Sequence, residues 1–255
     1  TGICIGLSLG GYKPVLTHQR VDFALLSLDQ IINNAAKIKY MFGGSVNCPI
    51  VLRMIVGRGW GQGPTHSQNL QMLFSGIPGL RVAIPGTPND AYSMLRASIK
   101  SADPIIFLEH RWLHNSITSD EFTFFEDSLK KQNFLIQGDD YTVVANSYMI
   151  PEAIRAMKLL KEVKNISGDL INFRNYHLDY LEEIKKSVKK TNKILFIDTA
   201  QENFSIAHAV ILKLKEEFPN IEISKILAAP NVPEPTSHFL TRKIYLDAEN
   251  ILKEL

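Results

Sequence analysis

The chain has 255 residues, of which 45% are hydrophobic and 21% are charged, and its formal net charge is +2. These values are typical of a globular protein of one or two domains and give no reason to expect nucleic-acid binding. No run approaches the roughly 18 uninterrupted apolar residues of a membrane span, and no signal peptide is evident. The two cysteines, Cys4 and Cys48, do not make a disulfide framework in a chain of this length. We therefore expect a protein of a reducing compartment that is not secreted.

The first ten residues alternate small and large apolar side chains, and the first of them is Thr1 rather than a methionine. A protein rarely opens inside a tightly packed helix, so we expect upstream residues to be missing from this sequence. A helix over 2–10 that is rich in small residues also needs a close neighbour. This predicts a dimer or a heterotetramer.

Strands and helices alternate along the first half of the chain, which predicts a parallel sheet with helices on both faces. In the long helix the apolar residues recur at helical spacing, and Thr87 and Pro88 suit a helix start. The predicted elements are a strand at 13–17, a helix at 23–41, a strand at 49–54, a glycine-rich loop at 57–63, a helix at 67–74, a strand at 80–84, a helix at 87–100 and a strand at 104–108.

Residues 111–139 are polar, aromatic-rich and weakly periodic, which is typical of a linker that contains short strands at most. The second half then repeats the alternation. Its predicted elements are strands at 141–145, 169–173, 193–198 and 221–228 and helices at 151–163, 178–188, 204–218 and 247–255. The prediction is an α/β protein of two domains, 1–125 and 139–255, each a mainly parallel sheet flanked by helices, with a linker at 126–138.

The most unusual segment is the loop after the strand 49–54, which reads GRGWGQGPTHSQ. Glycines let the backbone approach a ligand closely, and in an open α/β sheet the ligand crevice lies at the carboxyl ends of the strands. The loop delivers His66 just before a predicted helix, where Ser67 and Gln68 could orient the ring. Such a histidine can act as an acid or base near neutral pH, or it can simply cap the helix. No Gly-Lys-Ser/Thr follows, so this is not a phosphate loop.

Phe23, next to Asp22, opens the long helix at another crevice position. An aromatic residue at such a place is usually part of the core. The alternative is a platform on which a flat heterocycle stacks. No pair of histidines has the HExxH spacing, so we do not expect a catalytic zinc site.

Several segments resemble, in order and at matching spacing, the β-subunits of the E1 components of pyruvate, branched-chain 2-oxoacid and acetoin dehydrogenases. They are TGICIGLSLGGYKPVL, DFALLSLDQIINNAAKIKYMFGG, CPIVLRM, GRGWGQGPTHSQ, IPGLRVAIPGTPNDAYSMLRASIKSADPIIFLEH and PEPTSHFLTRKIYLD. The likeness covers nearly the whole chain and is strongest over 1–110. It implies that 1–125 is a transketolase-like pyrimidine-binding domain without its N-terminal part, and that 139–255 is a transketolase C-terminal-like domain.

The resemblance also implies a cofactor. The first domain would bind the aminopyrimidine ring of thiamine diphosphate, while an α-type partner would hold the diphosphate and Mg²⁺. Phe23 would stack on the aminopyrimidine, Gln19 would lie at another pocket position, and His66 would be the active-site histidine that handles protons and orients the substrate or the lipoyl arm. Some members bind a structural K⁺, mainly through backbone oxygens, at positions that match Ile50, Ser98, Ser101 and Asp103.

One departure from the family concerns the glutamate that activates the cofactor. Its position would fall a few residues before Thr1, and no acidic residue precedes Asp22. We therefore expect the chain as given not to activate thiamine diphosphate. Either the gene product is longer, or the glutamate lies on another polypeptide, or the chain is a non-catalytic relative.

The resemblance implies a β-type component that works with an α-type E1 subunit in an α₂β₂ assembly. It would decarboxylate a pyruvate-like 2-oxoacid and serve a lipoyl acyltransferase, in the bacterial cytoplasm or the mitochondrial matrix. The alternatives are a non-catalytic dimerising subunit, and a transketolase-type or synthase-type half-enzyme that forms carbon–carbon bonds.

Overall fold

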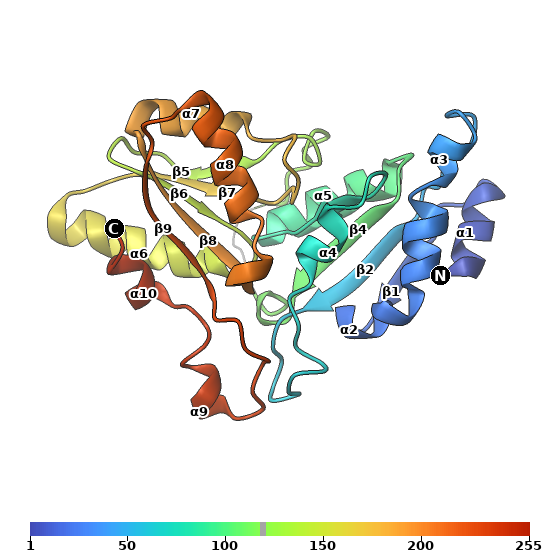
Figure 1. The fold of residues 1–255 in the computed structure, drawn as a ribbon, viewed down its shortest axis with the longest axis horizontal. Coiled ribbons are helices and arrows are strands. Elements are labelled where there is room, and N and C mark those ends of the chain that lie inside the picture. Colours follow the sequence, from blue (N-terminus) through green and yellow to red (C-terminus); the bar gives the residue numbers. More distant parts are fainter. Residues whose placement is uncertain (118–120) are drawn as a thin grey trace.

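The computed structural model describes residues 1–117 and 121–255, which form two α/β halves side by side (Figure 1). The elements of the first half are α1 (Gly2–Leu9), β1 (Val15–His18), α2 (Val21–Ala24), η1 (Leu25–Ser27), η2 (Gln30–Ala35), α3 (Ile38–Met41), β2 (Val51–Val56), α4 (Gln71–Ser75), β3 (Arg81–Ala83), α5 (Pro88–Lys100), β4 (Ile105–His110) and η3 (Arg111–Leu113). Those of the second half are β5 (Asn133–Ile136), β6 (Thr142–Ala145), α6 (Met149–Lys164), β7 (Asp169–Asn172), α7 (Glu182–Thr191), β8 (Lys193–Gln201), η4 (Glu202–Phe204), α8 (Ala207–Glu217), β9 (Glu222–Ala229), α9 (His238–Thr241) and α10 (Ala248–Leu252).

The first sheet has the strand order β1-β2-β4-β3, and all its pairs are parallel. The second sheet has the order β5-β7-β6-β8-β9 and is parallel except for β5, which runs antiparallel to β7. The predicted class, α/β with two mainly parallel sheets, is confirmed. β5 lies inside the stretch 126–138 that was predicted as a linker, and it closes one edge of the second sheet.

Helices cover both faces of each sheet, because the strands are apolar on both sides. In the second half, side chains of α7 and α8 pack on one face, and side chains of α6 and α10 pack on the other (Figure 1). In the first half, α5 covers one face, while α4 and the helical segment 21–41 cover the other. A single apolar cluster contains side chains of both halves, including Met54 and Phe173, so the two cores are continuous.

The helix predicted at 23–41 is helical but irregular. It consists of α2, the 3₁₀ turn η1, the π-helical segment η2 and α3. The π segment ends at Ala35, and Ala35 and the next residue, Ala36, are both buried against the core. By contrast, α5 begins as predicted: Pro88 is in the first turn, and the Thr87 hydroxyl accepts the N–H of Asp90.

Two helices begin four residues later than predicted. α4 begins at Gln71 instead of 67, because the Gln68 carbonyl accepts the Gly57 N–H at 3.2 Å and is not available to a helix. α7 begins at Glu182 instead of 178, where the Tyr180 carbonyl accepts the side-chain amide of Gln132 at 3.1 Å. In both cases a long-range contact overrides the local pattern.

The two halves are joined through the free edge of β3. Ala83 forms an antiparallel bridge with Asn175, the Ile84 N–H donates to the Arg174 carbonyl at 2.7 Å, and the Tyr176 N–H donates to the Val82 carbonyl at 3.0 Å. The first sheet is thereby extended by a segment of the second half. No helix in the part of the chain that the structure describes is long and apolar enough to cross a membrane.

Candidate functional site

Two chain segments meet at the carboxyl edge of the first sheet. β1 ends at His18 and leads through Gln19 to α2, and the neighbouring strand β2 ends at Val56 and leads into the glycine-rich loop. Because β1 and β2 are parallel, their carboxyl ends lie side by side. The loop extends from the sheet beside α9 of the second half (Figure 1).

Phe23 and His66, predicted as parts of a site from separate segments, are brought together. Their ring centroids lie 5.1 Å apart at an interplanar angle of 83°, so the two rings meet edge to face. The Phe23 side chain is 41% exposed, so part of its ring is accessible. This ring pair provides an accessible aromatic face with an imidazole at its side.

The His66 ring is oriented by its neighbour Thr65, whose hydroxyl oxygen lies 2.8 Å from Nδ1. If the hydroxyl donates to Nδ1, the neutral ring carries its proton on Nε2. The prediction that Ser67 and Gln68 orient this ring is wrong. Within the described residues, the buried Ser67 hydroxyl has no partner, and the Gln68 amide donates to Asp22 at 2.8 Å. The Gln68–Asp22 bond instead ties the loop to α2.

Arg20 also holds the two segments together, and sequence reasoning missed it. This side chain is 4% exposed and donates to the Gly57 carbonyl at 2.7 Å and to the side-chain oxygen of Gln62. Burial lowers its pKa, and the charge of Asp22 opposes that effect. The sequence did offer one indication of Arg20: it is a charged residue between Gln19 and Phe23, which were both predicted at the site.

His110 lies beneath the loop, at the end of β4. Its ring is fully buried, stacks on Tyr148 at 5.2 Å and meets Trp112 edge to face at 5.7 Å. Burial lowers the pKa of this imidazole to about 3, so it stays neutral. Gly57, with φ of +73°, passes so close to the ring that a Cβ would collide with it. The buried His110 ring therefore packs directly against the backbone of the loop at Gly57.

Gln19 is exposed at the same edge of the sheet as Phe23. The positions predicted for K⁺ lie at the opposite, amino edge. There the Ile50 carbonyl accepts the Ile105 N–H at 2.9 Å, the Ser98 hydroxyl donates to the Met94 carbonyl at 2.7 Å, and the Ser101 hydroxyl accepts the Asp103 N–H at 3.0 Å. The K⁺ site stays a prediction.

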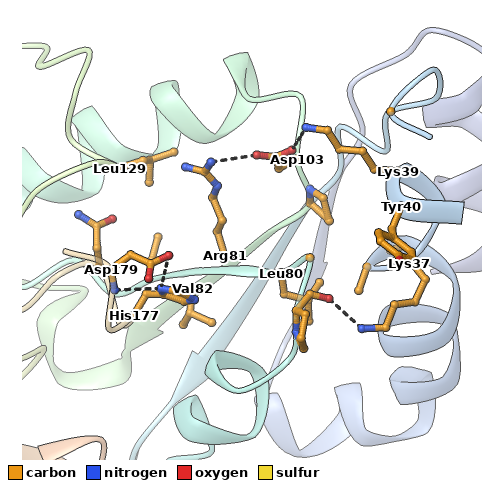
Figure 2. A pocket seen from close by; sticks show the side chains of 18 of the residues that line it. Lys37, Lys39, Tyr40, Leu80, Arg81, Val82, Asp103, Leu129, His177 and Asp179 are labelled. Atoms are coloured by element: carbon orange, nitrogen blue, oxygen red, sulfur yellow. Dashed lines mark hydrogen bonds and ion pairs between the residues drawn. The ribbon is translucent and has the colours of Figure 1, made fainter. Parts of the chain in front are cut away.

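The amino edge also contains a cleft of about 860 Å³ between the two halves. Figure 2 shows the Asp103 carboxylate between Lys39, at 2.7 Å, and Arg81, at 3.1 Å. In the same view the Lys37 ammonium donates to the Pro78 carbonyl at 2.8 Å. Lys39, Arg81 and Lys37 in this cleft therefore already have partners. The cleft lies at the opposite end of the strands from His66.

Metal-binding side chains do not gather in the described part of the chain. No group of three or more His, Cys, Asp or Glu residues there could hold a metal ion. An aromatic platform, an imidazole and a glycine-rich backbone are therefore the chemical groups that this chain brings to the carboxyl edge.

Two family models match the chain. Residues 1–115 match the pyrimidine binding domain of transketolase, and residues 130–251 match the transketolase C-terminal domain. The first match contains Gln19, Phe23 and His66.

The chain is 31% identical over 264 residues to the mitochondrial pyruvate dehydrogenase E1 component subunit beta-1 of Arabidopsis thaliana, covering 99% of this chain and 71% of that protein. It is 32% identical over 239 residues to the 2-oxoisovalerate dehydrogenase subunit beta of Bacillus subtilis, covering 91% and 72%. A solved structure of a split-gene transketolase, an inactive beta4 tetramer, has the same fold, with a TM-score of 0.79 at 19% identity, covering 99% of this chain and 78% of that one. The chain belongs to the family of E1 β-subunits of thiamine-diphosphate-dependent 2-oxoacid dehydrogenases.

Proposed function

We propose that this chain supplies the aminopyrimidine side of a thiamine diphosphate site and that, with an α-type E1 subunit, it decarboxylates a pyruvate-like 2-oxoacid. One observation carries the proposal: the exposed ring of Phe23 lies 5.1 Å from the His66 ring at the carboxyl edge of the domain that matches a pyrimidine-binding family. This is the edge at which open α/β sheets bind ligands.

The residues present fit the proposed cofactor. A flat aminopyrimidine can stack on an aromatic face, and 41% of Phe23 is exposed. Gln19, on the same edge, provides an amide that can hydrogen-bond a heterocycle. Bound thiamine diphosphate would supply the electron sink for decarboxylation, and the protein would supply position and electrostatics.

His66 is the proposed proton carrier. With Nδ1 next to the Thr65 hydroxyl at 2.8 Å, the ring is fixed and Nε2 is the nitrogen that can exchange a proton with a bound molecule. The neighbouring Phe23 ring excludes water from one side of the imidazole. We assign His66 to holding and moving a proton near the substrate, and to orienting the substrate or a lipoyl group.

The diphosphate and Mg²⁺ would be held by the α-type partner. In support, no metal-binding cluster of His, Cys, Asp or Glu occurs in the described residues of this chain. Exposed apolar side chains are available for subunit contacts: Trp60 on the glycine-rich loop is 73% exposed, and Ile3 on α1 is 83% exposed. We propose an α₂β₂ assembly that serves a lipoyl acyltransferase, in the bacterial cytoplasm or the mitochondrial matrix. We propose two domains, near 1–125 and 139–255, with β5 from the stretch between them completing the second sheet, and K⁺ near Asp103 remains part of the proposal.

The test is to co-express the full-length protein with its α-type partner and to measure reduction of an electron-acceptor dye. Pyruvate and branched-chain 2-oxoacids are supplied in turn, with thiamine diphosphate and Mg²⁺. We expect 2-oxoacid-dependent reduction that is lost without the cofactor and falls at least roughly 100-fold in His66→Gln, the usual effect of removing a proton carrier. A stable complex that reduces no dye with any of these acids would contradict the proposal.

A further inference from the structure

The glycine-rich loop that carries His66 rests on the second half of the chain, and Arg58 makes the contact. The Arg58 backbone N–H donates to the Tyr245 hydroxyl at 2.8 Å, and its guanidinium donates to the Thr236 carbonyl at 2.8 Å. Both partners belong to residues 234–245, which we call the clamp segment. These two bonds cross between parts of the chain that are more than 170 residues apart.

The glycines of the loop fit this segment closely. Gly61 and Gly63 have φ of +95° and +75°. A Cβ on Gly61 would lie 3.1 Å from the Thr236 carbonyl oxygen, and one on Gly63 would lie 2.7 Å from the Thr236 hydroxyl. The absence of side chains at these two positions therefore lets the loop lie directly on the clamp segment.

Two buried side chains of opposite charge at this contact each keep one polar atom without a hydrogen-bond partner among the described residues. Arg58 is 3% exposed and Glu234 is 7% exposed. Among the described residues, neither the Arg58 Nε nor the Glu234 Oε1 atom has a hydrogen-bond partner. A buried donor and a buried acceptor without partners are costly. The two groups act on each other through their charges, since Arg58 lowers the pKa of Glu234, and no direct ion pair joins them among the described residues.

We propose that the clamp segment positions the loop that carries His66, with Arg58 as the connecting group and the Glu234 carboxylate as the charge that holds Arg58 in place. Glu234 and Tyr245 are then positioning residues for the reaction, acting through the loop. The inference rests on the proposed function for its catalytic consequence, but the contact itself is independent of that function.

The charge of Glu234 can change under working conditions. The charged and titratable groups that face it are Arg58 on the loop, Tyr245 on the clamp segment, and Asp198 on β8, which lines the same small cavity of about 10 Å³, the size of one water molecule. Burial raises the pKa of Glu234 to about 7, and Arg58 and Tyr245 oppose that effect. The carboxylate is therefore present above this pH and largely lost below it.

The test uses the complex with its α-type partner and measures how fast diethyl pyrocarbonate modifies His66. The tryptic peptide 59–81 contains no other histidine, so mass spectrometry reports on His66 alone. The variants are Glu234→Gln, which keeps the shape and removes the charge, and Tyr245→Phe, which removes the hydroxyl. Glu216→Gln, on the exposed side of α8, is the matched control.

We expect Glu234→Gln to change the modification rate of His66 roughly fivefold at about pH 8, the effect of removing one buried charge that attracts Arg58. The ratio of variant to wild-type rate should approach one at about pH 5.5, where wild-type Glu234 is itself neutral. Tyr245→Phe should change the rate at both pH values, and the Glu216→Gln rate should equal that of the wild type.

A ratio of one for Glu234→Gln at both pH values would overturn the inference, and so would a ratio that differs from one without depending on pH. Because Gln is isosteric with Glu, this arm remains informative even if Tyr245→Phe does not fold. Modification is measured without turnover. A complex that lacks 2-oxoacid activity would therefore contradict the proposed function, while the ratio would still decide the role of the clamp segment.

Discussion

Two of the polar contacts between the halves of the molecule differ in how completely their charged groups are hydrogen-bonded. In one, the Asp90 contact, the carboxylate accepts Arg174 at 2.7 Å, Asn172 at 2.6 Å and the Thr87 hydroxyl at 2.7 Å. In the other, the Arg58 contact, the oppositely charged Arg58 and Glu234 are both buried, and each keeps an unmatched polar atom within the described residues.

The two contacts therefore have different roles. A buried ion pair whose members are fully hydrogen-bonded has one favourable arrangement, so the Asp90 contact fixes how the halves are joined. A contact with unpartnered buried polar atoms contributes less to the stability of the fold, because each such atom has lost its hydrogen bonds to water. Of these two contacts, the Arg58 contact is the one that touches the loop carrying His66, so the less completely bonded contact lies where the proposed chemistry takes place.

The largest effect is expected at the Asp90 contact. Arg174→Ala leaves a buried carboxylate without its cation and should lower the free energy of unfolding by about 3–5 kcal/mol. Urea unfolding followed by circular dichroism measures this. Arg155→Ala is the control, because the Arg155 side chain is 65% exposed and its pair with Glu152 is worth little. Equal stability of the two variants would mean that the Asp90 contact does not join the halves as described.

A smaller effect is expected from filling the space between the loop and the clamp segment. Gly63→Ala places a Cβ against the Thr236 hydroxyl at a positive φ, and should cost about 2 kcal/mol. Gly11→Ala is a matched control, since Gly11 has φ of +91° but no other atom within 4 Å of the position that a Cβ would take. We expect Gly11→Ala to cost only the backbone strain, about 1 kcal/mol, in the same urea assay. If both variants lose the same stability, the loop does not pack on Thr236.

The smallest effect is a dependence on pH that only the Arg58 contact should show. The folded-state pKa of Glu234 is raised to about 7, so folding is penalised once the carboxylate is charged, and stability falls as the pH rises through that value. Glu234→Gln removes the penalty. It should raise the melting temperature by roughly 2–4 °C at about pH 8, by less near pH 5, and have almost no effect at about pH 4, below the ordinary carboxyl pKa. A variant that is less stable than the wild type at pH 8 would show that the charge contributes more than its burial costs.

Much of the fold follows from local patterns, and the exceptions have a common cause. The alternation of strands and helices, the start of α5 at Pro88 and the burial of the parallel strands are visible in the sequence. The start of α4 was wrong because the Gln68 carbonyl bonds to Gly57.

Contacts between distant parts of the sequence also limited the prediction of the candidate site. Phe23 and His66 were predicted as candidates because each follows a strand at its carboxyl end, where open α/β sheets bind ligands, and a glycine-dense loop precedes His66. Arg20 and Glu234 were not found. Arg20 acts by contacting Gly57, and Glu234 acts by facing Arg58 across the two halves, and nothing in the local sequence of either residue records its partner.

Phe23 is the ring on which we propose that the cofactor stacks. The affinity of the protein for thiamine diphosphate tests this role most directly. Calorimetric titration of the complex with its α-type partner would compare wild type, Phe23→Ala and Leu26→Ala, the last a control on the same helical segment at a residue that is 95% exposed. Loss of one stacking partner is worth about 1–3 kcal/mol, so Phe23→Ala should weaken binding roughly 5- to 150-fold. Leu26→Ala should bind as the wild type does. Equal affinities for all three proteins would contradict the account.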